Sequence, residues 1–208
     1  MASVIRKEPA MIAFREDCNV PSGSRGEPSD QRATFGTGED AVTDQEHVAI
    51  SVCSMFHLRE AVNKFGPTHA IIMADPGTNV IVRRIPSLTL KFHDIRSLGD
   101  QLRQTLAQQG LTVPPSKDHV QAIIKFGRDL PSGARLLCCC TAGLSRSPAA
   151  ALIVMALSLP GREGEAFCSL MAIRPRSAPN PIMVAIADDL IGAGGRLIGT
   201  LPATRNKT

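Results

Sequence analysis

Short apolar runs and helically spaced apolar residues alternate along most of this chain. A short apolar run between polar or turn residues indicates a strand, and a continuous one indicates a strand buried on both faces. The pattern predicts strands at residues 48–52, 69–74, 79–83, 88–92 and 135–139. These runs therefore predict a central sheet with several short strands.

Helices are predicted between and after these strands, where apolar residues recur at intervals of three and four. The predicted helices cover residues 55–65, about 116–130, 147–157, 162–173 and 181–191. Ser116 is the predicted N-cap of the second helix, whose apolar face carries Val120, Ile123 and Ile124. The helix at residues 147–157 is apolar all round, which predicts that it is central and buried.

The alternation of strands and helices predicts the fold class and the domain organisation. It favours an α/β fold with a single parallel-rich central sheet flanked by helices. Residues 1–46 contain a long stretch rich in Gly, Ser, Pro, Asp and Glu with little hydrophobic periodicity, so we expect a disordered extension there. Residues 47–199 then form one domain, and residues 200–208 a C-terminal tail.

Composition and charge narrow the function classes. The net charge of +4 suits an anionic ligand such as a phosphate ester. The chain has no Trp or Tyr for base stacking and no long Lys/Arg run, so nucleic acid is not expected as a partner. The longest apolar stretch, residues 149–157, is shorter than the roughly 20 residues of a membrane span. The N-terminus lacks the apolar core of a secretory signal, so we expect a cytoplasmic protein without a membrane partner.

One segment carries recognisable chemistry: the phosphate loop, residues 140–147, with the sequence CTAGLSRS. A strand, a tight glycine-containing loop and a helix N-terminus together form an anion-binding device, because backbone N–H groups converge there and the helix dipole adds positive potential. Arg146 adds a planar guanidinium that can grip two phosphate oxygens. The predicted phosphate-binding residues are Thr141, Ala142, Gly143, Leu144, Ser145 and Arg146.

Cys140 opens the phosphate loop and is the predicted nucleophile. Thiolates are stabilised at helix N-termini and beside arginine. A thiolate beneath a bound phosphate is placed for in-line attack and a phosphocysteine intermediate. Ser147 is predicted to hydrogen-bond the sulfur and ease its departure in the second step. This chemistry requires no metal or other cofactor, and the six cysteines lack the spacing of a zinc site, so we expect reduced thiols.

The pattern Cys140-x5-Arg146-Ser147, after an apolar strand and before an Ala-rich helix, resembles the phosphate loop of the protein tyrosine and dual-specificity phosphatase superfamily. Over roughly residues 48–197 the chain resembles a small bacterial-type predicted tyrosine phosphatase. Residues 174–181 are similar to the Arg-Pro…Pro-Asn segment that follows the loop in that superfamily. The resemblance implies a phosphatase-like fold and hydrolysis of phosphotyrosine or a similar monoester, in a phosphorylated protein or a small aryl phosphate.

The superfamily also uses an aspartic acid on a mobile loop to protonate the leaving group. Asp94 directly follows the apolar run at residues 88–92 and is the predicted general acid; Asp75 and Asp100 are the alternatives. The loop interior, residues 141–145, carries no Lys or Arg, whereas members that act on inositides tend to have basic residues there. A polyanionic lipid substrate is therefore not expected.

One position departs from the superfamily. The residue before the nucleophile is usually His, which is implicated in tuning the thiolate, and here it is Cys139. This departure motivates an alternative function, a catalytically impaired module that binds a phosphorylated partner.

Two further hypotheses involve sulfur chemistry. Rhodanese-type sulfur transferases also place a cysteine at the start of a cradle loop, although the spacing to Arg146 fits phosphatases better. Alternatively, Cys139, Cys53 or Cys168 traps an oxidised Cys140 as a disulfide.

Overall fold

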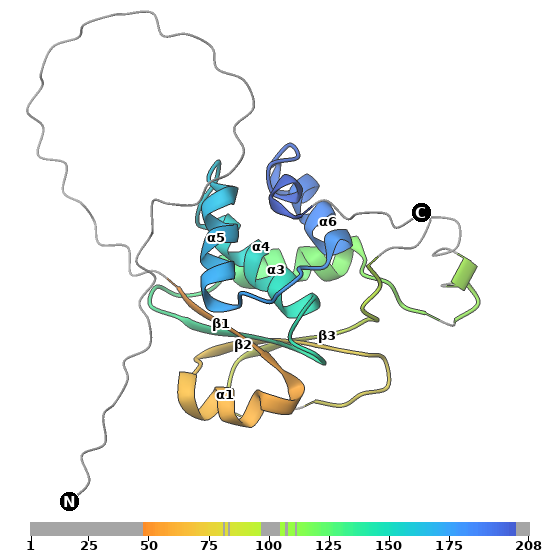
Figure 1. The fold of residues 1–208 in the computed structure, drawn as a ribbon. Coiled ribbons are helices and arrows are strands. Elements are labelled where there is room, and N and C mark those ends of the chain that lie inside the picture. The colour runs from red at the N-terminus through yellow and green to blue at the C-terminus, as the bar shows by residue number, and fades with distance from the viewer. Residues whose placement is uncertain are drawn as a thin grey trace, which may run out of the picture.

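The computed structural model describes residues 48–80, 82, 84–96, 105–106, 108–110 and 112–202. The extension predicted at residues 1–46 and most of the predicted tail lie outside these residues. Figure 1 shows one sheet with helices on both faces. Among the helices of the described residues, none combines the length and the apolar character that a membrane span requires.

Four parallel strands form the sheet, in the order β1-β4-β2-β3. Their bounds are Ala49–Ser54 for β1, His69–Ala74 for β2, Ser87–Lys91 for β3 and Arg135–Cys140 for β4. The last five residues of both central strands, β2 and β4, are buried, as their continuous apolar sequences predict. Because the four strands are parallel, their carboxyl ends meet at one edge of the sheet, where ligands bind in α/β folds.

Helices cover both faces of this sheet. The 3-10 helix η1 (Met55–His57) and α1 (Leu58–Phe65) lie on one face. The larger layer on the other face contains α3 (Lys117–Arg128), α4 (Arg146–Leu157), α5 (Glu163–Ile173), α6 (Pro181–Ile191) and η2 (Ile198–Thr200). The predicted N-cap at Ser116 is confirmed, because its side chain accepts a hydrogen bond from the backbone N–H of His119.

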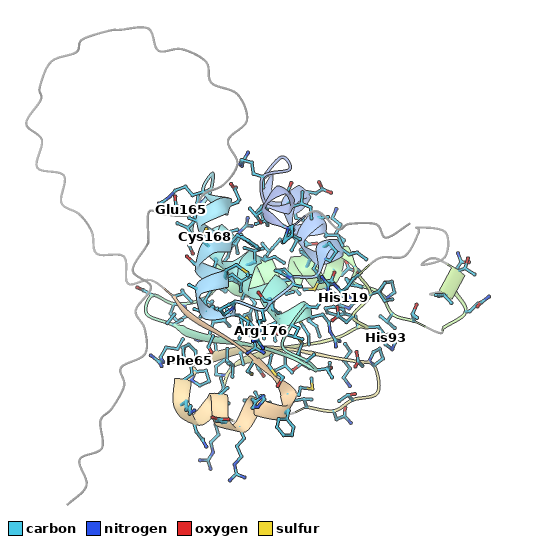
Figure 2. All side chains as sticks on the ribbon, viewed as in Figure 1. Phe65, His93, His119, Glu165, Cys168 and Arg176 are labelled. Carbon is cyan, nitrogen blue, oxygen red and sulfur yellow. The ribbon has the colours of Figure 1, made fainter. Side chains whose placement is uncertain are left out.

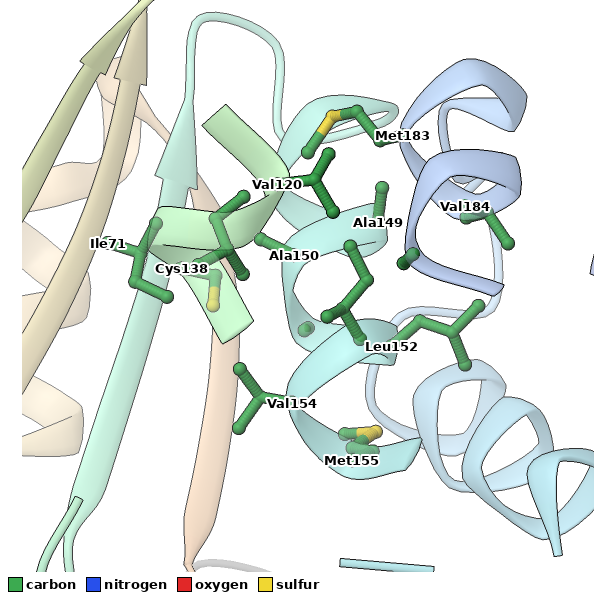
Figure 3. Packing of buried hydrophobic residues seen from close by; sticks show 14 of the residues in the cluster. Ile71, Val120, Cys138, Ala149, Ala150, Leu152, Val154, Met155, Met183 and Val184 are labelled. Atoms are coloured by element: carbon green, nitrogen blue, oxygen red, sulfur yellow. The ribbon is translucent and has the colours of Figure 1, made fainter. Parts of the chain in front are cut away.

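The helix α4 occupies the centre of the larger layer, between the sheet and α6 (Figure 3). Every residue from Arg146 to Ala156 is buried, which confirms the prediction from its apolar sequence. Ala149, Ala150 and Ala151 have the small side chains that such close surroundings require, while Leu152 and Ile153 fill the space between layers. Burying each of these larger side chains contributes about 1.5–3 kcal/mol. The phosphate loop therefore leads into the best-buried helix of the fold.

The predicted α/β fold with a parallel central sheet is confirmed, but the strand predicted at residues 79–83 is wrong for its described residues. Asn79, Val80 and Val82 form no strand. Val80 and Val82 pack, with Ile85, against the small apolar cluster between the sheet and α1. Their apolar character thus reflects packing in a connecting segment and not pairing with a neighbouring strand.

Candidate active site

The phosphate loop joins the carboxyl end of β4 to the N-terminus of α4. Cys140 is the last residue of β4 and is only 1% exposed. Its Sγ accepts a hydrogen bond from the backbone N–H of Gly143 at 3.2 Å and lies 3.1 Å from Oγ of Ser147. The sulfur thus lies beneath the loop with two polar hydrogens available to it.

The carbonyl groups of the loop are bound to groups outside it. The backbone N–H of Met55 donates to the carbonyl of Thr141 (3.3 Å), and Nε of Arg174 donates to that of Gly143 (3.2 Å). The backbone N–H of Ala178 donates to the carbonyl of Leu144 at 2.8 Å. Two segments that are distant from the loop in the sequence, at Met55 and at residues 174–178, therefore fix the orientation of these loop peptides.

The carbonyl of Ser145 is held in the same way, by the backbone N–H groups of Ala149 and Asn180, each at 3.1 Å. In a trans peptide the N–H points away from the carbonyl of the same unit. Each of these four carbonyls is followed by the N–H group of the next residue. These N–H groups, those of Ala142, Leu144, Ser145 and Arg146, therefore point away from the donors that bind the carbonyls. A preformed set of donors at the N-terminus of α4 is an anion-binding arrangement.

Arg146 is the first residue of α4, and its side chain is 3% exposed. Nη1 donates to Oδ1 of Asp75 (2.9 Å) and to the carbonyl of Phe92 (2.6 Å). Nη2 donates to Oγ1 of Thr141 at 3.0 Å, whereas Nε is buried and has no partner among the described residues. A buried donor without an acceptor is costly, and an oxygen of a bound phosphate would supply one.

Gly143 adopts φ of +70°, a left-handed conformation that favours glycine. It also packs directly on the end of β1. A Cβ at this position would lie 2.7 Å from the backbone nitrogen of Ser54 and 2.9 Å from the carbonyl oxygen of Cys53. The loop therefore requires glycine here for two independent reasons, conformation and space.

Replacing Gly143 with alanine is expected to lower the free energy of unfolding by about 3 kcal/mol or more and to weaken phosphate binding. Gly161→Ala is the matched control, because Gly161 also has positive φ (+81°) but a Cβ added there would have no atom within 4 Å. The control is expected to lose only about 1–2 kcal/mol, the cost of the left-handed backbone. Urea unfolding and phosphate titration of both variants measure the difference. Equal losses of stability, with phosphate affinity retained in both, would contradict the packing role of Gly143.

Asp94 contacts the loop at its far end. Its Oδ1 accepts hydrogen bonds from Oγ of Ser145 (2.7 Å) and from Nδ2 of Asn180 (2.8 Å). Asn180 also caps α6, because its Oδ1 accepts from the backbone N–H groups of Ile182 and Met183. Asp94 therefore connects the segment after β3, the phosphate loop and the start of α6.

Asp75, an alternative acid in the sequence, contacts the opposite end of the loop. It follows β2 directly, and its Oδ2 lies 3.3 Å from Oγ1 of Thr141, while Oδ1 pairs with Arg146. Its side chain is 41% exposed. The structure brings both Asp75 and Asp94 to the loop, and Asp100 lies outside the described residues.

The structure also gives a role to Arg174, the first residue of the segment at residues 174–181. Its bond to the Gly143 carbonyl shows that it holds the loop. Arg176 is exposed and lies near the sheet edge in Figure 2. Figure 2 also labels His93 and His119; His93 accepts from the backbone N–H of Val113, and His119 stacks on Phe92, so both have structural contacts.

The three consecutive cysteines point to alternate faces of β4. Cys138 and Cys140 lie in the large core under α4, whereas Cys139 lies in the small cluster on the α1 side. Burial raises the pKa of the Cys138 thiol well above its usual value. Cys53, Cys138, Cys139 and Cys140 are free thiols as expected, but Cys168 is disulfide-bonded, which corrects the expectation of reduced thiols throughout. Cys168 is therefore not the free thiol that trapping an oxidised Cys140 would need.

Metal ligands are not expected from the sequence. Within the described ranges, no group of His, Cys, Asp or Glu side chains is arranged to hold a metal ion.

No protein-family model matches the sequence, and no curated protein is significantly similar to it. Among solved structures, that of DUSP15 is similar, with a TM-score of 0.51 at 17% identity over 74% of this chain and 89% of that one. The phosphatase domain of Yvh1 from Chaetomium thermophilum has a TM-score of 0.48 at 16% identity, covering 71% of this chain and 92% of the other. Human DUSP28 has a TM-score of 0.44 at 16% identity, covering 72% and 95%.

The fold assignment depends on the first of these structures. The described part of this chain has the fold of the dual-specificity and protein tyrosine phosphatases.

Proposed function

We propose that this protein is a cysteine-dependent phosphatase that hydrolyses a phosphate monoester, such as phosphotyrosine, through a phosphocysteine intermediate. The observation that carries the proposal is the position of Cys140 Sγ beneath a loop whose carbonyl groups are bound outward. A phosphate held by the N–H groups of that loop has its phosphorus in line with the sulfur. The likeness of the fold to DUSP15 supports the same class of reaction.

In the first step the Cys140 thiolate attacks phosphorus, and the bond to the leaving oxygen breaks. Arg146 and the loop N–H groups stabilise the charge on the equatorial oxygens. In the second step water attacks the phosphocysteine, and the thiolate leaves. Ser147, 3.1 Å from the sulfur, stabilises the departing thiolate by donating a hydrogen bond.

The loop interior favours a monoester without further negative charges. Thr141, Ala142 and Leu144 are exposed around the loop and carry no charge. Leu144 is 42% exposed, so the exposed part of the loop includes an apolar side chain. An aryl group fits such a surface better than a polyanionic headgroup does, which supports phosphotyrosine or a small aryl phosphate as the substrate.

Asp94 is proposed as the general acid, and leaving-group dependence tests this assignment. Asp94→Asn is expected to slow hydrolysis of phenyl phosphate by about 10²-fold or more, because protonation matters most for a poor leaving group. Hydrolysis of p-nitrophenyl phosphate, whose leaving group is good, is expected to slow much less. Steady-state rates on both substrates measure the ratio.

Asp75→Asn is the matched comparison, because Asp75 also contacts the loop but pairs with Arg146. Its loss is expected to reduce kcat/KM for both substrates by a similar factor, since it orients the phosphate-binding guanidinium. If Asp75→Asn shows the leaving-group dependence and Asp94→Asn does not, the acid is Asp75 and Asp94 has a structural role.

A phosphate-binding module remains the second candidate. It is favoured by one observation: Cys139 occupies the position of the superfamily histidine, and its side chain lies on the face of the sheet away from Cys140. Assaying pure protein for p-nitrophenyl phosphate hydrolysis and for binding of inorganic phosphate separates the two. Turnover supports the enzyme, binding without turnover supports the module, and the absence of both contradicts each of them.

A further inference from the structure

Cys53 and Cys139 are a pair of thiols on the opposite face of the sheet from Cys140. Cys53 of β1 and Cys139 of β4 occupy paired positions in the parallel register. Both belong to the small apolar cluster between the sheet and α1, so their side chains share a face. Neighbouring strands lie about 4.8 Å apart. Disulfides span Cα separations of about 4.4–6.8 Å, so the backbone positions are compatible with one.

Cys53 is one of the residues that line a cavity, although it is only 6% exposed. The cavity has a volume of about 220 Å³ and is lined by Cys53 together with Ser54, His57, Lys64 and Arg174. This volume admits a molecule the size of hydrogen peroxide. Cys138 faces the large core instead, so among the three consecutive thiols only Cys139 shares a face with Cys53.

The two thiols have different electrostatic surroundings. The neighbouring Cys139 thiol lowers the pKa of Cys53 against the effect of burial, and the nearby charge of Arg174 adds to the lowering. The Cys53 thiol, with burial, raises the pKa of Cys139. Of the two thiols, Cys53 is therefore the one that we expect to react first.

We propose that Cys53 and Cys139 are a reactive dithiol that forms a disulfide bond on exposure to hydrogen peroxide. The Cys53 thiolate attacks one peroxide oxygen, which breaks the O–O bond, and the released hydroxide takes up a proton to become water. The sulfur of Cys139 then attacks the sulfenic sulfur, and its own proton leaves with the hydroxyl group as a second water. The two thiols together lose two electrons, and one peroxide molecule gains them and becomes two waters.

The position of the pair connects it to the loop without involving the nucleophile. The carbonyl of Cys53 lies against Gly143 and is 3.5 Å from Oγ of Ser147. A disulfide that shifts the end of β1 would therefore shift the loop as well. The bond itself forms whether or not the protein is a phosphatase, so the failure of either proposal leaves the other intact.

The test treats the full-length protein with peroxide, alkylates the remaining thiols under denaturing conditions and maps cross-linked peptides by mass spectrometry. A dithiothreitol-sensitive link between the Cys53 peptide and the peptide with residues 138–140 is expected in the wild type. It is also expected in Cys138→Ser and Cys140→Ser, and it should fall to background in Cys53→Ser and Cys139→Ser. Thermal unfolding of each variant checks that it is folded.

Two outcomes would overturn the proposal. One is a link that survives in Cys139→Ser and disappears in Cys140→Ser, which would make Cys140 the partner of Cys53. The other is the absence of any link in wild type and Cys140→Ser while Cys53 is oxidised to its sulfonic acid. Since Cys140→Ser leaves both members of the pair in place, the second outcome does not depend on how the Cys139→Ser variant folds.

Discussion

Cys140→Ser is expected to reduce the hydrolysis of p-nitrophenyl phosphate by more than about 10³-fold, because it removes the nucleophile. Phosphate binding is expected to remain, since the loop N–H groups and Arg146 are unchanged. A serine hydroxyl is a weak nucleophile at its ordinary pKa, so it does not replace the cysteine. Steady-state rates and phosphate titration of the variant measure both effects.

Cys138→Ser is the matched control for this loss. Cys138 is buried two residues before Cys140 on the same strand, and its side chain faces the core. Its replacement tests whether hydrolysis requires the thiol of Cys140 in particular or any buried thiol in β4. A Cys140→Ser protein that hydrolyses the substrate at a substantial fraction of the wild-type rate would rule out a phosphocysteine intermediate.

Arg146→Lys is expected to lower kcat/KM by about 10²-fold, equivalent to ~2.7 kcal/mol of transition-state stabilisation. An ammonium group cannot replace a guanidinium that binds Asp75, the Phe92 carbonyl and Thr141 at once and still offers Nε to a phosphate. Phosphate affinity should fall together with the rate, because the same contacts serve both.

Arg59→Lys provides the control, because Arg59 is an exposed residue of α1. It is expected to leave both kcat/KM and phosphate affinity within about twofold, as for most surface substitutions. An Arg146→Lys protein that binds phosphate as well as the wild type does would show that the guanidinium serves only to hold the loop.

Much of the fold follows from local sequence. The run at residues 69–74 coincides with β2, because no polar residue interrupts it before Asp75. The central position of α4 is predictable, since no face of it is polar. The segment at residues 79–83 shows the limit of this reasoning, because its short apolar run resembles a strand, yet Val80 and Val82 pack without pairing. An apolar run identifies a buried stretch of the chain, whereas pairing depends on a partner strand elsewhere.

The sequence predicts the part of the candidate site that lies within the phosphate loop. Cys140, Gly143, Arg146 and Ser147 are close in sequence, and the helix start orients them together. The groups that hold the loop from outside are not predictable from residue spacing. Met55 and Ala178 act through backbone N–H groups, so their side chains give no signal. For residues 174–181, only the resemblance to a known segment indicates a connection with the loop.

One residue that contacts the phosphate loop has a different role from the one that the sequence suggests. Asp75 is an alternative acid in the sequence, and the structure pairs it with Arg146 across the mouth of the loop. An ion pair between residues so far apart in the chain depends on β2 and β4 being neighbours in the sheet. That adjacency is a tertiary property, which no local pattern contains.

The complete burial of α4 has a consequence for partial unfolding. The phosphate loop is attached to the element with the most protected backbone, whereas Asp94 follows β3 at the edge of the sheet. Local opening starts at edges and exposed segments before it reaches a core helix. As urea is raised, the protein should lose the ability to cleave poor leaving groups at a concentration where it still retains phosphate. Phosphate binding would then persist at urea concentrations that abolish general acid catalysis.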